Sequence, residues 1–265
     1  MKPKPSSNQK TSNCLVTLSL DTGRKLVTAF QRQGIQAVLL PSIETSAIAA
    51  SSPELIRRAA AIDSYDWFIF ISPNAVRYGF DWLQQLSPKL NLESVRLAAV
   101  GRATAEQLQN KSGQAVLSPS TGSGAAALLA MDELQSLADT RILIVRGQGG
   151  KDELAQHLHS RGAQVDYAEL YTRHCPASIS EKQLASLTAI KYIIVGSQQG
   201  YLNLYDMLGS AALNWLLQRT LLVPNPTVAE LVHAKLGLQA NTMVLADMNH
   251  DTIIHTLKQR INFGG

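Results

Sequence analysis

The sequence has few cysteines and no long hydrophobic run. Only Cys14 and Cys175 occur in 265 residues, without CxxC spacing. A small secreted protein held together by disulfides would have more, so this usage indicates a reducing compartment, and we expect the cytoplasm. The apolar run at residues 125–131 is ended by Asp132 and Glu133, and no run reaches the roughly 18 apolar residues that span a bilayer. We therefore expect no membrane association.

Patterns for metals, nucleotides and hydrolytic nucleophiles are also missing. The six histidines form no ligand pattern, and no Gly-x-Ser-x-Gly string occurs. The loop RGQGGKD at residues 146–152 has Asp152 where a dinucleotide fingerprint needs glycine and where an NTPase loop needs Ser or Thr. We expect no cofactor and no metal. We interpret the loop as a tight strand-to-helix turn, whose free amides can still hold a carboxylate.

The net charge of +4 is spread along the chain and forms no dense basic tract. This does not favour nucleic acid as a partner. A small ligand rich in carboxylates or phosphates needs only a few cations and helix N-termini. Residues 1–13 are polar and contain two prolines, so we expect a loose, disordered tail there.

Short apolar runs alternate with amphipathic stretches along the rest of the chain. The runs that we predict to be buried strands lie at residues 14–18, 37–40, 67–71, 97–100, 142–145, 192–195 and 220–223. Strands that alternate with helices form parallel sheets with right-handed crossovers. The predicted fold class is therefore α/β, with doubly wound parallel sheets.

The chain also contains two kinds of internal repeat. Residues 14–40 match residues 141–167 in the order of their elements, and residues 69–108 match residues 192–231, which gives the order A, B, A, B. Extended segments follow each A unit and can run antiparallel as two linkers between domains. The first A unit then packs with the last B unit. We predict domain 1 at 14–41 and 174–265, domain 2 at 44–170, and connectors near 41–45 and 168–173.

Polar residues follow several predicted strands where a helix begins. Ser72, Thr104, Ser197 and Thr227 all stand at such points. Each is expected to be a helix N-cap, and each can also meet a ligand, because ligands of doubly wound sheets bind at the carboxyl ends of strands. Tyr171 lies in the second connector, where a tyrosine that only packs is less usual.

Three strings resemble the uroporphyrinogen-III synthase family. They are DWFIFISPNAV at residues 66–76, AAVGRATA at residues 98–105 and RILIVRGQGGKD at residues 141–152, and the likeness extends over about residues 14–257. The resemblance implies two α/β domains joined by a two-stranded antiparallel connector. It also implies a cofactor-free lyase of heme biosynthesis, which closes the linear tetrapyrrole hydroxymethylbilane into uroporphyrinogen III with loss of water and inversion of ring D.

Eight residues are expected to form the site, and the resemblance matches five of them to the family's motifs, namely Ser72, Thr104, Tyr171, Ser197 and Thr227. Our hypothesis is that Tyr171 is the catalytic group that assists departure of the hydroxyl. The residues expected to bind the substrate's carboxylates are Ser72, Pro73, Asn74, Thr104, Arg146, Ser197 and Thr227. The match to the family's motifs is poorer in the second B unit, where Val195-Gly196 stands in place of the family's Phe-Thr. It is also poorer near the start of the chain, where Leu18-Ser19 stands in place of the family's Arg-Pro.

Two further interpretations stay open beside this one. The same fold and strand-end amides would serve a non-catalytic two-domain protein that closes on an anionic small molecule. A nucleotide-dependent enzyme is disfavoured by the failed glycine patterns. If the chain is the synthase, we expect a monomer that makes transient contact with hydroxymethylbilane synthase, the source of its unstable substrate.

Overall fold

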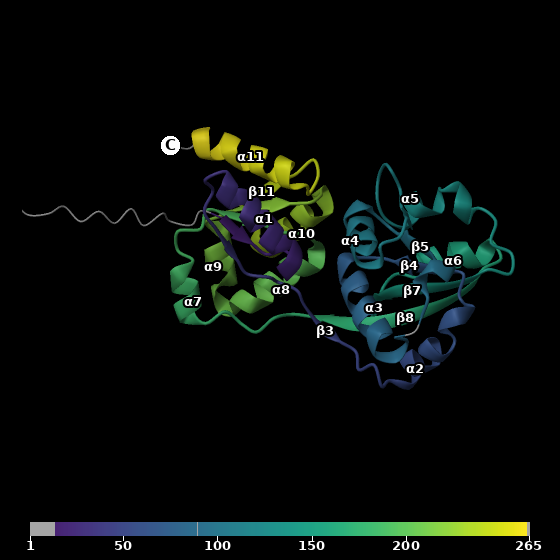
Figure 1. Ribbon diagram of the computed structural model, residues 1–265. Coiled ribbons are helices and arrows are strands. Elements are labelled where there is room, and N and C mark those ends of the chain that lie inside the picture. Colours follow the sequence, from purple (N-terminus) through teal and green to yellow (C-terminus); the bar gives the residue numbers. More distant parts are fainter. Residues whose placement is uncertain (1–13, 89, 264–265) are drawn as a thin grey trace, which may run out of the picture. The chain divides into compact units, whose positions relative to one another are not determined.

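The computed structural model describes residues 14–88 and 90–263, and it divides into two compact units (Figure 1). The first unit contains Met1–Glu44 and His174–Gly265, and the second contains Thr45–Arg173. The tail predicted at residues 1–13 lies outside the described residues.

The first unit is built on a five-stranded sheet in the order β11-β10-β9-β1-β2, and every neighbouring pair is parallel. Its strands are β1 (Cys14–Val16), β2 (Ala37–Leu39), β9 (Tyr192–Ile194), β10 (Thr220–Val223) and β11 (Asn241–Val244). Its helices are α1 (Leu20–Arg32), α7 (Glu181–Ser186), α8 (Gln198–Leu208), α9 (Ala212–Leu217), α10 (Pro226–Leu236) and α11 (His250–Phe263).

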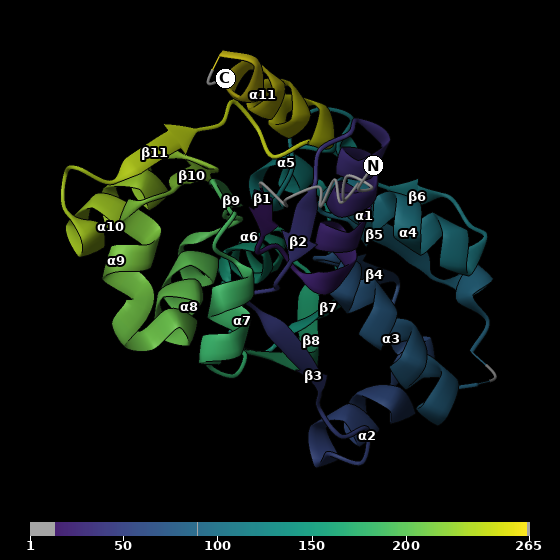
Figure 2. The same ribbon diagram turned by 90° about the vertical axis from the view of Figure 1, so that its left-hand side faces the viewer.

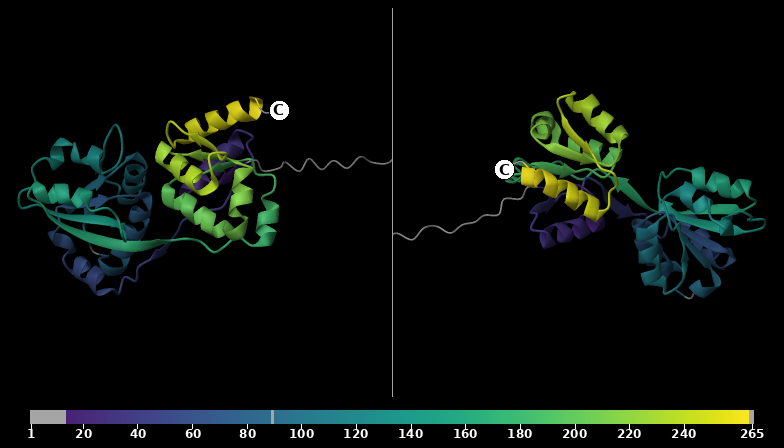
Figure 3. Two further views of the ribbon diagram at one scale, coloured as in Figure 1. Left: turned by 180° about the vertical axis from the view of Figure 1, so that it is seen from behind. Right: turned by 90° about the horizontal axis from the view of Figure 1, so that it is seen from above.

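Helices cover both faces of this first sheet. Helices α1 and α11 lie on one face, and α8, α9 and α10 lie on the other, which is clearest in Figures 2 and 3. In α1 the apolar side chains of Leu26 and Phe30 recur at helical spacing and are buried against the sheet. Strands enclosed in this way are apolar on both faces, as the fully buried β1 illustrates.

The second unit is built on a six-stranded sheet in the order β3-β8-β7-β4-β5-β6. Its strands are β3 (Glu44–Ala47), β4 (Trp67–Phe70), β5 (Arg96–Ala99), β6 (Val116–Leu117), β7 (Arg141–Gly147) and β8 (Gln164–His174). Its helices are α2 (Pro53–Ala60), α3 (Pro73–Leu86), α4 (Arg102–Ser112), α5 (Ala125–Leu129) and α6 (Glu153–Ser160). Helices α2, α3 and α4 pack on one face, and α5 and α6 pack on the other.

Strands β3 and β8 carry the chain between the two units. The chain leaves the first unit through β3 and returns to it at the end of β8, and the two strands are neighbours in the sheet. Because one strand enters the second unit and the other leaves it, they run in opposite directions. All other neighbouring pairs of this sheet, from β8 through β7, β4 and β5 to β6, are parallel.

Each sheet changes its winding direction once. In the first unit α1 connects β1 to β2 on one side, and α8 and α9 connect β9 to β10 on the other side. In the second unit α3 connects β4 to β5, and α6 connects β7 to β8 in the opposite direction. The adjacent pairs β1/β9 and β4/β7 are therefore topological switch points, where ligands of α/β sheets usually bind beyond the carboxyl ends of the strands.

The predicted α/β class with doubly wound, mainly parallel sheets is confirmed. All seven predicted strands are present, with small differences at their ends. Strands β6 and β11 were not predicted. β6 has only two residues, and β11 lies at the edge of its sheet with no buried side chain, so neither gives an apolar run.

The burial of the two thiols predicts different reactivities. Burial raises the pKa of Cys14 to about 12, whereas Cys175 is exposed at the end of the second connector. A thiol reagent at pH 8 should therefore modify Cys175 in the native protein and reach Cys14 only in denaturant. Counting the modified groups by mass spectrometry tests this, and fast native labelling of Cys14 would contradict the burial of β1.

Candidate functional site

Ser72 stands at the β4/β7 switch point and caps helix α3. Its Oγ accepts a hydrogen bond from the backbone N–H of Ala75 at 3.0 Å. Pro73 occupies the first helical position, where its missing N–H costs nothing, and Asn74 follows it. Ser72, Pro73 and Asn74 are all half-buried, so the first turn of α3 faces the space beyond the strand ends.

The hydroxyl of Tyr171 lies 3.0 Å from Ser72 Oγ, and either group can be the donor. Only 2% of Tyr171 is exposed. If Tyr171 donates, Ser72 Oγ already accepts two hydrogen bonds and its own hydrogen is unspent. If Ser72 donates, the hydrogen of Tyr171 is unspent. Neither hydroxyl has a further partner in the described part of the chain, so the pair retains one O–H donor in both cases.

Two residues that sequence reasoning missed hold the Tyr171 ring. The ring of Tyr78 on α3 stacks on it, with centroids 5.0 Å apart and an interplanar angle of 19°. Gly147, which pairs with Tyr171 in the sheet, lies so close that a Cβ there would be 2.5 Å from Tyr171 Cε2. A glycine two residues after a predicted strand was a signal for this close approach, but nothing in the sequence pointed to Tyr78.

Arg146 was expected to bind substrate, but its guanidinium is already occupied. It is 7% exposed and contacts Asp152 and Glu169, each at 2.9 Å. It also lies 3.6 Å from the centroid of the Tyr167 ring. Burial lowers the pKa of Arg146, but its hydrogen bonds to Asp152 and Glu169 more than offset this and hold the pKa above its usual value. We reinterpret Arg146 as a brace for the loop between β7 and α6.

The expectation that Thr104 and Thr227 are N-caps is wrong. Gly101 is the N-cap of α4, and Thr104 is buried in its first turn. The N-cap of α10 is Asn225, whose side chain accepts from the N–H of Val228 at 3.1 Å, and Thr227 is exposed. Both helices begin earlier in the chain than the spacing implied. Ser197 does cap α8, by accepting from Gly200 N–H at 3.1 Å.

The first unit has a pocket of about 210 Å³ at its own switch point. Its lining combines strand-end residues with the start of helices α1 and α8. The lining residues are Thr17, Leu18, Ser19, Thr22, Ser42, Ile43, Gly196, Ser197 and Gly200. Ser197 is thus the predicted site residue that lines this pocket, whereas Thr227 does not line it.

Most hydroxyls of this pocket are engaged within the protein. Thr17 donates to the carbonyl of Ile194 at 2.8 Å, and Ser42 donates to the carbonyl of Thr17 at 3.0 Å. Ser19 donates to Thr22 Oγ1 at 3.2 Å. The hydrogens of Thr22 and Ser197 have no acceptor among the described residues and are available to a ligand. Beside the positive end of the α1 helix dipole they suit a carboxylate.

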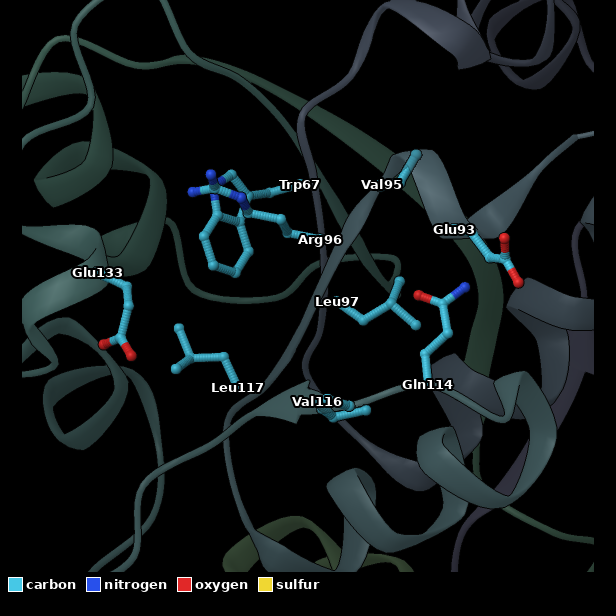
Figure 4. A pocket seen from close by; sticks show the side chains of 10 residues that line it. Trp67, Glu93, Val95, Arg96, Leu97, Gln114, Val116, Leu117 and Glu133 are labelled. Atoms are coloured by element: carbon cyan, nitrogen blue, oxygen red, sulfur yellow. The ribbon is translucent and has the colours of Figure 1, made fainter.

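A larger cavity of about 650 Å³ contains none of the predicted site residues (Figure 4). It lies beside Trp67 and Arg96, which are the first residues of β4 and β5, whereas Ser72 follows the carboxyl end of β4. The cavity therefore lies at the amino-terminal ends of these strands, whereas the switch-point site lies beyond their carboxyl ends. Among residues 14–88 and 90–263, no group of three His, Cys, Asp or Glu side chains is placed to hold a metal ion.

The fold and its two sites define a class, namely an α/β protein of two doubly wound units with a polar site at each switch point. The family model described as "Uroporphyrinogen-III synthase HemD" matches residues 24–243, and the chain belongs to this family. It is 30% identical over 251 residues to the uroporphyrinogen-III synthase of Escherichia coli K12, covering 92% of this chain and 99% of that protein. It is 29% identical over 248 residues to the Salmonella typhimurium LT2 synthase, with the same coverage.

Solved structures agree on the fold. The uroporphyrinogen-III synthetase of Helicobacter pylori 26695 has a TM-score of 0.62 at 13% identity, covering 94% of this chain and 99% of that chain. A mutant synthase of Thermus thermophilus has a TM-score of 0.58 at 16% identity, with the same coverage. No helix in the described part of the chain is long and apolar enough to cross a membrane.

The brace formed by Arg146 predicts a pH-dependent loss of stability. Hydrogen bonds from Arg146 and Tyr167 hold the pKa of Asp152 below its usual value. Because this pKa is depressed in the folded state, the pair stabilises the fold above the unfolded pKa of about 3.9, and the effect is lost as pH falls through the folded pKa. Arg146→Gln should therefore lower the urea midpoint at pH 7 and lower it less at pH 3.

Arg102 provides the matched control for this measurement. Its side chain is 89% exposed and pairs with Glu106 on the surface of α4, so Arg102→Gln should leave the midpoint almost unchanged at both pH values. Equal losses for Arg146→Gln and Arg102→Gln would contradict the proposed brace.

Proposed function

We propose that this chain closes hydroxymethylbilane into uroporphyrinogen III, with the β4/β7 switch point as the reacting site. Family membership makes the chain an enzyme of the lyase class that acts on a tetrapyrrole. The observation that carries the assignment of the site is the buried Tyr171 hydroxyl 3.0 Å from Ser72, with one donor hydrogen to spare. Family membership does not favour the alternative of a non-catalytic binding protein.

The chemistry requires orientation and one hydrogen-bond donor. The C–O bond of the terminal hydroxymethyl group breaks, and the hydroxyl leaves with a proton as water. The electron-rich pyrrole stabilises the azafulvene cation that remains. The methylene carbon that carried the hydroxyl then bonds to the substituted carbon of ring D. This gives a spiro intermediate that fragments, recloses with ring D inverted and loses a proton. The net change is the loss of one water, so the enzyme's task is to hold the reacting ends together.

The Ser72–Tyr171 pair is suited to the first step. Its unspent O–H can donate to the departing hydroxyl and stabilise the negative charge that develops on oxygen. Tyr171 is buried and its hydroxyl contacts Ser72. Its ring is held in place because Tyr78 and Gly147 lie against it. We therefore assign the donor role to the two hydroxyls as a unit, with Tyr171 as the catalytic candidate.

The carboxylates of the substrate need neutral donors and weak positive fields. We propose that the first turn of α3, with Ser72, Pro73 and Asn74, binds substrate in the second unit. Thr104, in the first turn of α4, is proposed to line the same edge. In the first unit we assign carboxylate binding to Thr22 and Ser197 in the 210 Å³ pocket. Thr227 lies in helix α10, which follows strand β10, the neighbour of β9 in the sheet.

The same proposal covers domains, partners and location. We propose that the domains are residues 14–41 with 174–265, and 44–170, joined by connectors near 41–45 and 168–173. We further propose a cytoplasmic monomer that uses no cofactor and receives its substrate through transient contact with hydroxymethylbilane synthase.

The function predicts the isomer of the product. Freshly made hydroxymethylbilane closes spontaneously to isomer I, whereas this protein should give isomer III as the main product. Oxidation to the uroporphyrins and chromatographic separation of the isomers measures the ratio. A product that is isomer I alone, with folded protein present, would refute the synthase activity.

Removal of the Tyr171 hydroxyl should slow the reaction without unfolding the chain. We expect Tyr171→Phe to lower kcat on the order of 10²-fold, because the hydroxyl that orients and polarises the Ser72 hydroxyl is lost. Tyr65→Phe is a matched control, since Tyr65 is also buried in the second unit and bonds a side chain, Asp166, at 2.9 Å. Wild-type kcat in Tyr171→Phe would remove the role of this residue but not the isomer result.

A further inference from the structure

Tyr78 is fixed at both ends of its side chain. Its ring stacks on Tyr171 at 5.0 Å, and its hydroxyl lies 3.0 Å from both the carbonyl oxygen and Oγ1 of Thr45. The Arg77 guanidinium lies 4.5 Å from the Tyr78 ring centroid and also donates to Thr45 Oγ1, at 3.2 Å. Tyr78 thus links helix α3 to strand β3, the neighbour of the strand that carries Tyr171.

The same helix carries the partner of the Tyr171 hydroxyl. Ser72 caps α3 and Tyr78 lies in its second turn, so one rigid element holds both the ring and the hydroxyl of Tyr171. Ala75 and Val76 between them are completely buried, which fixes α3 on the sheet. Any rotation of the Tyr171 ring that breaks the contact with Ser72 must therefore also break the stack on Tyr78 or enter the space of Gly147.

We propose that Tyr78 is a positioning residue, which acts through its ring by holding the Tyr171 hydroxyl at Ser72 during the reaction. This inference rests on the proposed role of Tyr171. Tyr78 itself donates no proton to substrate, because its hydroxyl is directed to Thr45. The aromatic face of Tyr78 is the part that holds Tyr171. Phenylalanine at this position should therefore preserve activity, and an aliphatic side chain should not.

The test is a double-mutant cycle in the full chain, with hydroxymethylbilane as the probe. Tyr78→Leu should lower kcat about 3- to 10-fold, the factor that corresponds to the loss of one aromatic stack, and should change KM little. Tyr78→Phe should keep at least half of the wild-type kcat. In the Tyr171→Phe background Tyr78→Leu should have no further effect on kcat, because the hydroxyl that it positions is gone.

Each outcome of the cycle decides between the two assignments. If Tyr171→Phe has wild-type kcat, the role of Tyr171 is wrong and that of Tyr78 is wrong with it. If Tyr171→Phe is slow but Tyr78→Leu lowers kcat equally in both backgrounds, or not at all, the role of Tyr78 alone is refuted. Circular dichroism establishes that each variant is folded. Should Tyr78→Leu fail to fold, Tyr78→Met is used, since it fills the same space without an aromatic face.

Discussion

The reversal of winding direction at β1/β9 and β4/β7 is the constraint on which the rest of the structure depends. Parallel strands buried on both faces leave no polar group free along their length, because the backbone is paired and the side chains are apolar. Where the connections leave in opposite directions, the carboxyl ends of two adjacent strands stay uncovered. Free amides and hydroxyls are concentrated at these two places, and the proposed function uses both.

Helix capping and ligand binding share the same groups at these points. A serine that caps a helix uses one lone pair of its oxygen, and the capping bond itself leaves the hydrogen of the hydroxyl unused, as at Ser72 and Ser197. Capping therefore fixes the direction in which the remaining donor points, because the helix is itself held by a buried face. The structural interpretation of these serines and the functional one are compatible for this reason.

The sequence was sufficient for the fold class and for most strands, since a short apolar run is a local signal, as WFIF at residues 67–70 shows by itself. The contact between Ser72 and Tyr171 depends instead on the order of β4, β7 and β8 and on the register shift at Arg146/Gly147, neither of which is local. The ion pairs of Arg146 were not predicted, because its carboxylate partners come from two different elements. Thr104 was misjudged as a cap because the turn ends at Gly101.

The neutralisation of Arg146 has a consequence for the proposed reaction. A guanidinium without carboxylate partners at the end of β7 would add a positive charge to this switch point and would raise the energy of the proposed azafulvene cation. With Asp152 and Glu169 both bound to it, the buried Arg146 carries no uncompensated positive charge and contributes rigidity to the loop after β7. The substrate's carboxylates are then left to hydroxyls and amides, whose partial charges bind anions and oppose the formation of the proposed cation less than a full positive charge would.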